Sequence, residues 1–164
     1  MWGNDLETKA RNYAASRNLI LGEPLGDGFD GSVWEVQSNV NGNGWAVKLH
    51  RNVIRYATEK ACYLRLDDQG IVTVRGLSVP QLLRSDDQWK AIEMTKVQAP
   101  FLLDFAAASL DTRPSFSQEI LDQWHADLEE RYGERMSEVL LIIKALERLG
   151  IYLTDIHPGN LRFE

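Results

Sequence analysis

A cluster of three glycines followed directly by a β-strand pattern is the feature that most restricts the fold of this chain. Gly26, Gly28 and Gly31 precede the β-favouring run Val33–Gln37. Close glycines permit a tight turn and let backbone N–H groups approach an anion without an intervening side chain. A dinucleotide-binding turn needs a helix after its glycines, and a Walker loop needs a Gly-Lys-Ser/Thr ending. Neither follows here, so the glycines form either an ordinary hairpin or a phosphate-covering loop between strands.

The rest of the pattern predicts an α+β fold with an antiparallel sheet. A second β-favouring run at Trp45–Leu49 follows the Asn- and Gly-rich segment 39–44, which has the composition of a hairpin turn. Gly70–Leu83 and Trp89–Val97 are strand-like, and Pro100–Arg113 is expected to be an apolar linker. Helices are expected at Asn4–Asn18 with Asn4 as N-cap, Val53–Asp68 with Ile54, Ala57, Ala61 and Leu64 recurring at helical spacing, Ser115–Tyr132 and Met136–Leu149.

Composition and charge restrict the classes of partner. The net charge of −6 offers no positive field to replace the counterions of nucleic acid, so nucleic-acid binding is not expected. The single cysteine, Cys62, excludes an intrachain disulfide. No apolar stretch approaches the roughly 20 residues that cross a membrane. We therefore expect a cytoplasmic protein without membrane contact.

Lys48 is a candidate binding residue because it stands inside the apolar run Trp45–Leu49. A lone lysine in a strand is usually solvated at an edge. A lysine that points inward needs an anionic partner, since burying an unpaired ammonium is costly. Glu59 on the following predicted helix could be that partner, although taken alone it is more simply a surface carboxylate.

A third group of polar residues lies in the irregular segment Asp155–Asn160, with the sequence Asp-Ile-His-Pro-Gly-Asn. A carboxylate and an amide oxygen placed together can share a divalent cation or orient a hydroxyl group. Alone, such a cluster is more often a simple turn. His157 within it is expected to shape the loop and not to bind metal.

Taken together and in order, these elements resemble the motif set of the protein-kinase-like superfamily. Asp155–Asn160 is similar to the Asp-x-His-x-x-Asn loop of bacterial kinase-like and aminoglycoside-phosphotransferase-like proteins, and segment 59–66 is similar to their helix with the ion-pair glutamate. The resemblance covers Ile20–Glu164 and rests on Gly26-x-Gly28-x-x-Gly31-x-Val33, Ala46-Val47-Lys48, Glu59 and Asp155…Asn160.

The chain is expected to begin with a helix over residues 1–19, ahead of the region that the resemblance covers. The resemblance implies a sheet-rich lobe with its hinge over 20–97, and a short, truncated helical lobe over 98–164. It implies ATP and Mg²⁺ as cofactors. The three glycines would cover the phosphates, and Lys48 would hold them while pairing with Glu59. Asp155 would orient the attacking hydroxyl, and Asn160 would bind magnesium.

The resemblance also implies an adenine site. Val33 and Ala46 would lie against the base, and Ile92 would be the gatekeeper. The backbones of Glu93 and Thr95 would form hydrogen bonds with the edge of the adenine.

Several departures from the family pattern affect the expected function. No Asp-Phe-Gly follows Asn160, so the carboxylate that holds the principal magnesium is expected to be missing. Asp27 and Asp30 in the glycine loop are expected to repel phosphates. The chain is therefore either an ATP-dependent phosphotransferase, with an unknown acceptor, or a pseudokinase that binds nucleotide or protein without turnover. A homodimer mate or partner protein could also complete the site.

Overall fold

The computed structural model describes residues 2–164, with side chains from residue 5 onward, and confirms the α+β class with an antiparallel sheet. The helices are α1 (Trp2–Ser16), α2 (Val53–Asp68), α3 (Gln118–Tyr132), the 3₁₀ turn η1 (Gly133–Arg135) and α4 (Met136–Glu147). The strands are β1 (Leu19–Asp27), β2 (Gly31–Ser38), β3 (Gly44–His50), β4 (Thr73–Val74), β5 (Leu77–Ser78), β6 (Leu82–Asp86), β7 (Ala91–Met94), β8 (Phe101–Leu102), β9 (Ser109–Leu110), β10 (Ile151–Tyr152) and β11 (Leu161–Arg162).

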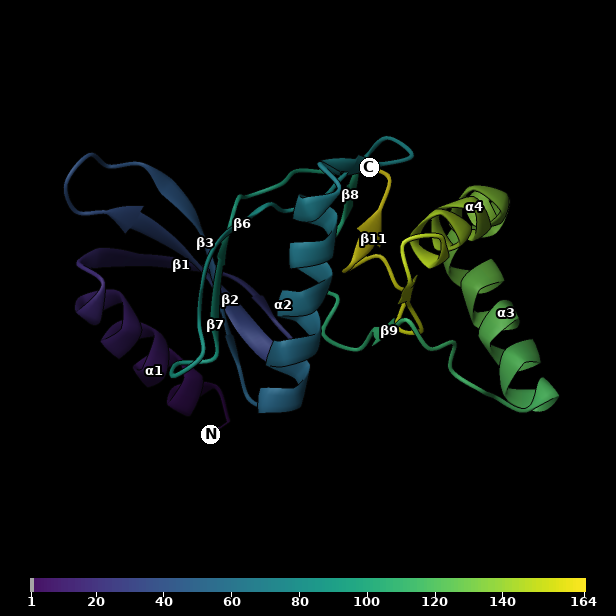
Figure 1. The fold of residues 1–164 in the computed structure, drawn as a ribbon, viewed down its shortest axis with the longest axis horizontal. Helices are drawn as coiled ribbons and strands as arrows, with labels where there is room; N and C mark the ends of the chain where they lie inside the picture. Colours follow the sequence, from purple (N-terminus) through teal and green to yellow (C-terminus); the bar gives the residue numbers. More distant parts are fainter. Residues whose placement is uncertain (1) are drawn as a thin grey trace.

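The main sheet has five antiparallel strands in the order β1-β2-β3-β7-β6. Helices α1 and α2 lie on opposite sides of it (Figure 1). Alternation along β3 decides which side chain meets which helix, because successive side chains of a strand point to opposite faces. Val47 and Leu49 join the apolar cluster under α1, whereas Ala46 joins the cluster under α2. The predicted turn at 39–44 is confirmed between Ser38 and Gly44.

Helix α1 packs Leu6, Ala10 and Tyr13 against the sheet. It runs from Trp2 to Ser16, so the prediction of a helix over Asn4–Asn18 with Asn4 as its N-cap is wrong at both ends. Asn18 already has a positive φ of 55°, which no helical residue adopts.

Helix α2 has the predicted bounds, and the Asn52 side chain caps its first turn by accepting from the Ile54 and Arg55 N–H groups. The residues from Ile54 to Leu64 that recur at helical spacing do not form the buried face. Ile54 and Leu64 are exposed, since the sheet and the segment after residue 100 pack against the other side of the helix. Both faces carry apolar residues at helical spacing, so periodicity did not discriminate between them. The buried face consists of Tyr56, Glu59, Cys62, Tyr63 and Leu66.

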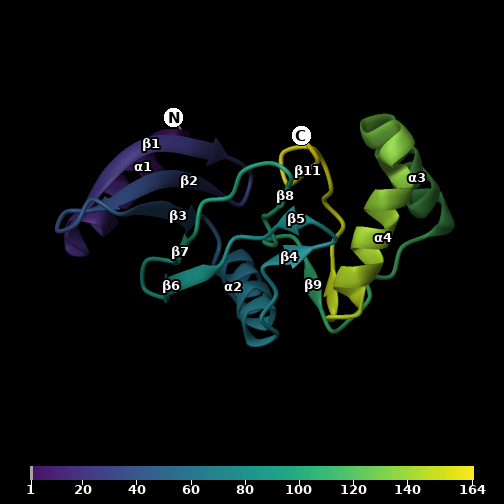
Figure 2. The ribbon, with the colours of Figure 1, turned by 90° about the horizontal axis from the view of Figure 1, so that it is seen from above.

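The predicted linker Pro100–Arg113 is instead part of the core. Leu102 and Phe105 have relative exposures of 1% and 0%. Strand β8 pairs antiparallel with β11, and β9 pairs antiparallel with β10. The short strands β4, β5, β8 and β11 group together beside α2 in the view from above (Figure 2). Two stretches distant in sequence, 101–110 and 151–162, are therefore joined at both ends.

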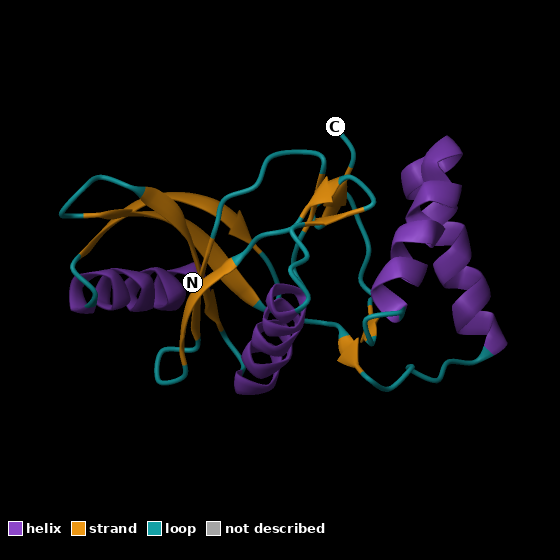
Figure 3. Ribbon diagram, turned by 45° about the horizontal axis from the view of Figure 1, so that its top comes forward, coloured by secondary structure: helices purple, strands orange, loops and turns teal. Residues whose placement is uncertain are grey.

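Helices α3 and α4 form the end of the molecule farthest from the main sheet (Figure 3). They add Leu128, Val139, Ile142 and Leu146 to the same apolar cluster that contains the α2 face. Gly133, with a φ of 52°, follows α3 and begins the turn that separates the two helices. Among residues 2–164, no helix combines the length and apolar character that crossing a membrane requires.

Candidate functional site

Lys48 is the centre of a buried ion-pair cluster. Its side chain is 5% exposed, and its Nζ donates to Glu59 Oε2 at 2.8 Å and to Asp104 Oδ1 at 2.9 Å. The strand β3 directs Lys48 toward α2, and the buried face of α2 presents Glu59. Lys48 is therefore not a solvated edge residue, and Glu59 is not a surface carboxylate. A buried ammonium with two carboxylate partners avoids the cost of an unpaired charge.

His50 is a further member of the cluster. It is the last residue of β3 and is fully buried. Its Nε2 lies 2.7 Å from Glu59 Oε2, and its Nδ1 lies 3.0 Å from the Lys90 carbonyl oxygen. Lys48 and His50 therefore converge on one oxygen of Glu59.

The protonation of this cluster follows from opposing effects. Burial by itself would raise the pKa of Glu59, but the charge of Lys48 and the hydrogen bond and charge of His50 outweigh it and lower the pKa to about 2. Burial would lower the pKa of Lys48, but the charges of Glu59 and Asp104 outweigh burial and raise it. The pair is thus an ammonium and a carboxylate at neutral pH.

The depressed pKa of Glu59 makes a prediction about acid stability. A carboxylate whose pKa falls on folding contributes stability above its unfolded pKa, near 4.5, and loses that contribution as the pH falls toward about 2. The gap in unfolding free energy between wild type and Glu59→Gln should therefore shrink as the pH falls below about 4.5. Urea unfolding at several pH values measures the gap. A gap that stays constant down to pH 3 would contradict the assigned ionisation.

Asp104 is the functional candidate that sequence reasoning missed. It lies just after β8, has a positive φ of 67°, and also accepts from the Ala106 N–H at 3.3 Å. The side chain is 32% exposed, which leaves part of the carboxylate open to solvent. Asp104 was the one acid in the apolar run Phe101–Leu110, and that isolation was the signal available.

The segment Asp155–Asn160 folds into a loop held by its own polar groups. Asn160 is buried, donates through Nδ2 to the Asp155 carbonyl at 2.6 Å and accepts at Oδ1 from the His157 N–H at 3.0 Å. The Gly159 N–H donates to His157 Nδ1 at 3.0 Å, and a Cβ at Gly159 would collide with that ring. The Asp155 side chain lies 3.8 Å from His157 Nε2 and remains 57% exposed, so it is accessible to a ligand.

The structure brings the Asp104 turn and this loop together. The Leu103 N–H donates to the Asn160 carbonyl at 2.8 Å. The residue just before Asp104 is therefore hydrogen-bonded to the last residue of the loop. At the other end, Ile151 pairs with Leu110. The candidate residues Lys48, Asp104 and Asn160 thus form one connected region between the main sheet and α4.

The glycine loop links β1 to β2, and its turn is closed by the Gly28 N–H bonding to the Gly31 carbonyl at 3.0 Å. A Cβ at Gly31 would collide with the Leu49 carbonyl, so close strand packing requires glycine there. At Gly26 a Cβ would meet no protein atom within 4 Å, and at Gly28 only the Gly31 carbonyl, at 3.8 Å. Packing within the protein therefore does not explain the glycines at these two positions.

The two acids of this loop are paired with arginines. Arg51 Nη2 lies 3.3 Å from Asp27 Oδ1, and Arg55 Nε lies 3.5 Å from Asp30 Oδ1. Their expected repulsion of phosphates is reduced because each carboxylate has a cationic partner. Ser32 also donates to Asp27.

The residues expected around adenine occupy β2, β3 and β7. Ala46 and Ile92 belong to the cluster under α2, and Val33 packs against it. The Glu93 side chain points to the opposite face, where it accepts from Tyr13, Arg17 and Trp45. The Thr95 N–H donates to the Gln81 carbonyl at 3.0 Å. This amide is thus already used inside the protein.

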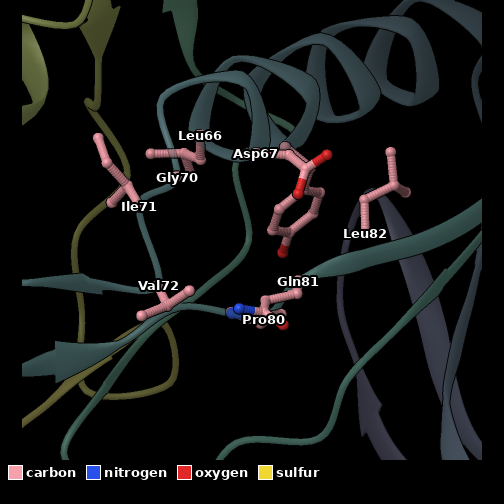
Figure 4. A pocket seen from close by; sticks show the side chains of 9 residues that line it. Leu66, Asp67, Gly70, Ile71, Val72, Pro80, Gln81 and Leu82 are labelled. Atoms are coloured by element: carbon pink, nitrogen blue, oxygen red, sulfur yellow. The ribbon is translucent and has the colours of Figure 1, made fainter.

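Two cavities lie outside the Lys48 cluster. One of about 30 Å³, near Asp67 and Gln81 at the end of α2, has room for about one water molecule (Figure 4). The other, of about 570 Å³, lies between α3, α4 and β10 and falls in the size range of small-molecule pockets. Its lining residues include Phe116, Ile120, Trp124 and Thr154, the residue before Asp155.

No protein-family model matches this sequence, and no curated protein matches it either. Across the described residues 2–164, no three His, Cys, Asp or Glu side chains are grouped to hold a metal ion.

Proposed function

We propose that this protein binds ATP with magnesium and acts as a protein-kinase-like phosphotransferase. The observation that carries the proposal is the double ion pair of buried Lys48 with Glu59 and Asp104. In protein kinases, a strand lysine paired with a helix glutamate and a nearby magnesium-binding aspartate must both be in place for phosphoryl transfer. A lysine held between two carboxylates on the α2 side of the sheet is suited to exchange one of them for phosphate oxygens.

Asp104 supplies a carboxylate in place of the magnesium-binding one that is missing after Asn160. Asp104-Phe105-Ala106 resembles the Asp-Phe-Gly motif, with alanine in place of glycine. It comes before the loop Asp155–Asn160 in sequence, whereas in kinases it follows that loop. Because β8 pairs with β11, the segment of Asp104 lies beside the end of the loop Asp155–Asn160 despite the reversed order in sequence.

The donor set at Asp104 and Asn160 fits magnesium. Mg²⁺ prefers oxygen ligands, keeps several waters and is usually held by one or two carboxylates plus substrate phosphates. Asp104 offers a partly exposed carboxylate. Asn160 Oδ1 accepts one internal hydrogen bond, and an amide oxygen has a second lone pair for a cation. When bound, the metal would neutralise charge on the transferring phosphoryl group.

The other residues then have distinct tasks. Lys48 would hold phosphate oxygens, while Glu59 keeps its ammonium in place. Gly26 and Gly28 would let backbone N–H groups approach the phosphates, as the space around them permits. Exposed Asp155 would orient the acceptor hydroxyl. Partly buried Val33 would provide apolar surface for the base, whereas Ala46 and Ile92 are enclosed in the core in this structure.

A pseudokinase is the second candidate, and one observation favours it. The Thr95 N–H, expected to bond adenine, is bonded to Gln81 instead. If this bond persists, a nucleotide would lose one of its orienting contacts. The protein would then be a regulatory module that keeps the ion-pair cluster for stability.

Calorimetric titration with ATP, with and without magnesium, tests the proposal. Wild type and the surface variant Asp122→Asn should bind ATP more tightly with magnesium. Asp104→Asn should lose that enhancement, by about tenfold or more, because it removes a carboxylate ligand. Urea unfolding checks that each variant is folded. Absence of binding by folded wild type at millimolar ATP would overturn the proposal.

Turnover separates the two candidates. Asp155→Asn should bind ATP as wild type does but form ADP at least about a hundredfold more slowly, as expected for loss of a group that handles the transferred proton. Equal, very slow ADP release by both proteins would support the pseudokinase.

A further inference from the structure

The surroundings of His50 restrict its protonation. Nδ1 faces the Lys90 carbonyl oxygen at 3.0 Å, and Nε2 faces Glu59 Oε2 at 2.7 Å. A carbonyl oxygen and an ionised carboxylate can only accept hydrogen bonds. A neutral imidazole has one N–H and would leave one ring nitrogen facing an acceptor without a proton. The imidazolium form donates to both, and the ring is fully buried, so no water can satisfy an unpaired nitrogen.

Glu59 does not supply the proton of the hydrogen bond between its Oε2 and His50 Nε2. That carboxyl also accepts from the Lys48 ammonium at 2.8 Å, which favours its ionised form. The two donors share Oε2, while Oε1 has no hydrogen-bond partner. A protonated carboxyl would sacrifice the attraction of a buried ammonium at hydrogen-bond distance.

We infer that His50 is a buried imidazolium and a positioning residue, which neutralises Glu59 so that the charge of Lys48 is available to a phosphate. With His50 charged, the cluster contains two cations, Lys48 and His50, and two anions, Glu59 and Asp104. With His50 neutral, a single cation faces both carboxylates. This inference rests on the proposed function for its phosphate, but its protonation state does not.

Other elements around His50 contribute few additional charges. The Tyr56 ring of α2 meets it edge-on at 5.5 Å. On the side of α1, the Lys9 ammonium reaches the His50 carbonyl at 3.5 Å. The titratable and charged groups that face His50 or its backbone are Lys48 on its own strand, Tyr56 and Glu59 on α2, Lys9 on α1, and Lys90, whose ammonium bonds to the Arg51 carbonyl.

The first test is ¹⁵N NMR of the histidine side chains in the protein without nucleotide. The chain has three histidines, and the variants His125→Gln and His157→Gln assign two of them, so His50 follows by difference. At pH 7.5, His50 should show both ring nitrogens protonated, while exposed His125 serves as the solvent-accessible control. A single protonated nitrogen on His50 would overturn the inference, whether or not the protein binds ATP.

The second test is the pH dependence of MgATP affinity. Affinity of wild type and His125→Gln should fall by about tenfold between a pH at which NMR shows both ring nitrogens of His50 protonated and a pH at which it shows only one. His50→Gln, which keeps a donor for Glu59 without a charge, should start weaker and show no such fall. Parallel profiles for wild type and His50→Gln would overturn the positioning role. Absence of ATP binding would overturn the proposed function and this role together, and the NMR result would still decide the protonation state.

Discussion

Replacing Glu59 with alanine should lower the free energy of unfolding by about 3–5 kcal/mol, because removal of one partner leaves buried charge uncompensated. Glu59 is 0% exposed and is bonded to both Lys48 and His50. Its loss would leave two cations with only the partly exposed Asp104 opposite them. The pair itself need not add net stability, since burying it was costly. The loss of unfolding free energy in Glu59→Ala therefore measures the penalty of breaking the ion pair.

Urea unfolding at pH 7 measures this loss, with Glu129→Ala as the matched control. Glu129 is an exposed helical glutamate, so its replacement should change stability by no more than about 0.5 kcal/mol. Glu59→Gln separates charge from volume and should lose nearly as much as Glu59→Ala. A loss below about 1 kcal/mol for Glu59→Ala would mean that the cluster is not closed to water.

Replacing Phe105 with alanine should cost about 3–5 kcal/mol, the usual result of emptying a buried aromatic site. Phe105 is fully buried, and its ring meets that of Tyr63 edge-on with centroids 5.3 Å apart. This contact ties the segment of Asp104 to α2. The variant should therefore also weaken magnesium-dependent ATP binding, because Asp104 would be less well placed opposite Lys48.

Thermal or urea unfolding provides the stability measurement. Phe29→Ala is the control, because Phe29 at the tip of the glycine loop is 92% exposed and should leave stability within about 0.5 kcal/mol of wild type. Similar small losses for both variants would show that segment 101–110 is not part of the core. Such a result would also remove the structural basis for assigning Asp104 to the site.

Helix α2 shows what local sequence could and could not predict. Its bounds, Val53–Asp68, were predictable because helical spacing and residue propensity are local properties. Its buried face was not. Apolar residues recur on both sides, and the side with Glu59 was buried because β3 and segment 101–106 lie there. Apolar periodicity left the choice between the two faces undecided.

Asp104 shows the same limit for the site. In the kinase motif order, the magnesium-binding carboxylate is expected after Asn160. Asp104 lies well before Asn160, in the apolar stretch Pro100–Arg113 that was expected to be a linker. Short two-residue strands such as β8 and β9 carry almost no periodic signal. Pairing with β10 and β11 creates these strands, and the pairings join residues about 40 positions apart for β9 with β10 and about 60 apart for β8 with β11.

The sequence by itself determined the α+β class, the hairpin of β2 and β3, the helices α2, α3 and α4 to within a few residues, and the candidacy of Lys48, Glu59, Asp155 and Asn160. These depend on local propensity, turn composition and residue chemistry. Tertiary structure alone decided that His50 and Asp104 join Lys48, and that Asp27 and Asp30 are paired. The physical reason is that burial and charge pairing depend on which surfaces meet, and that is a property of the folded chain.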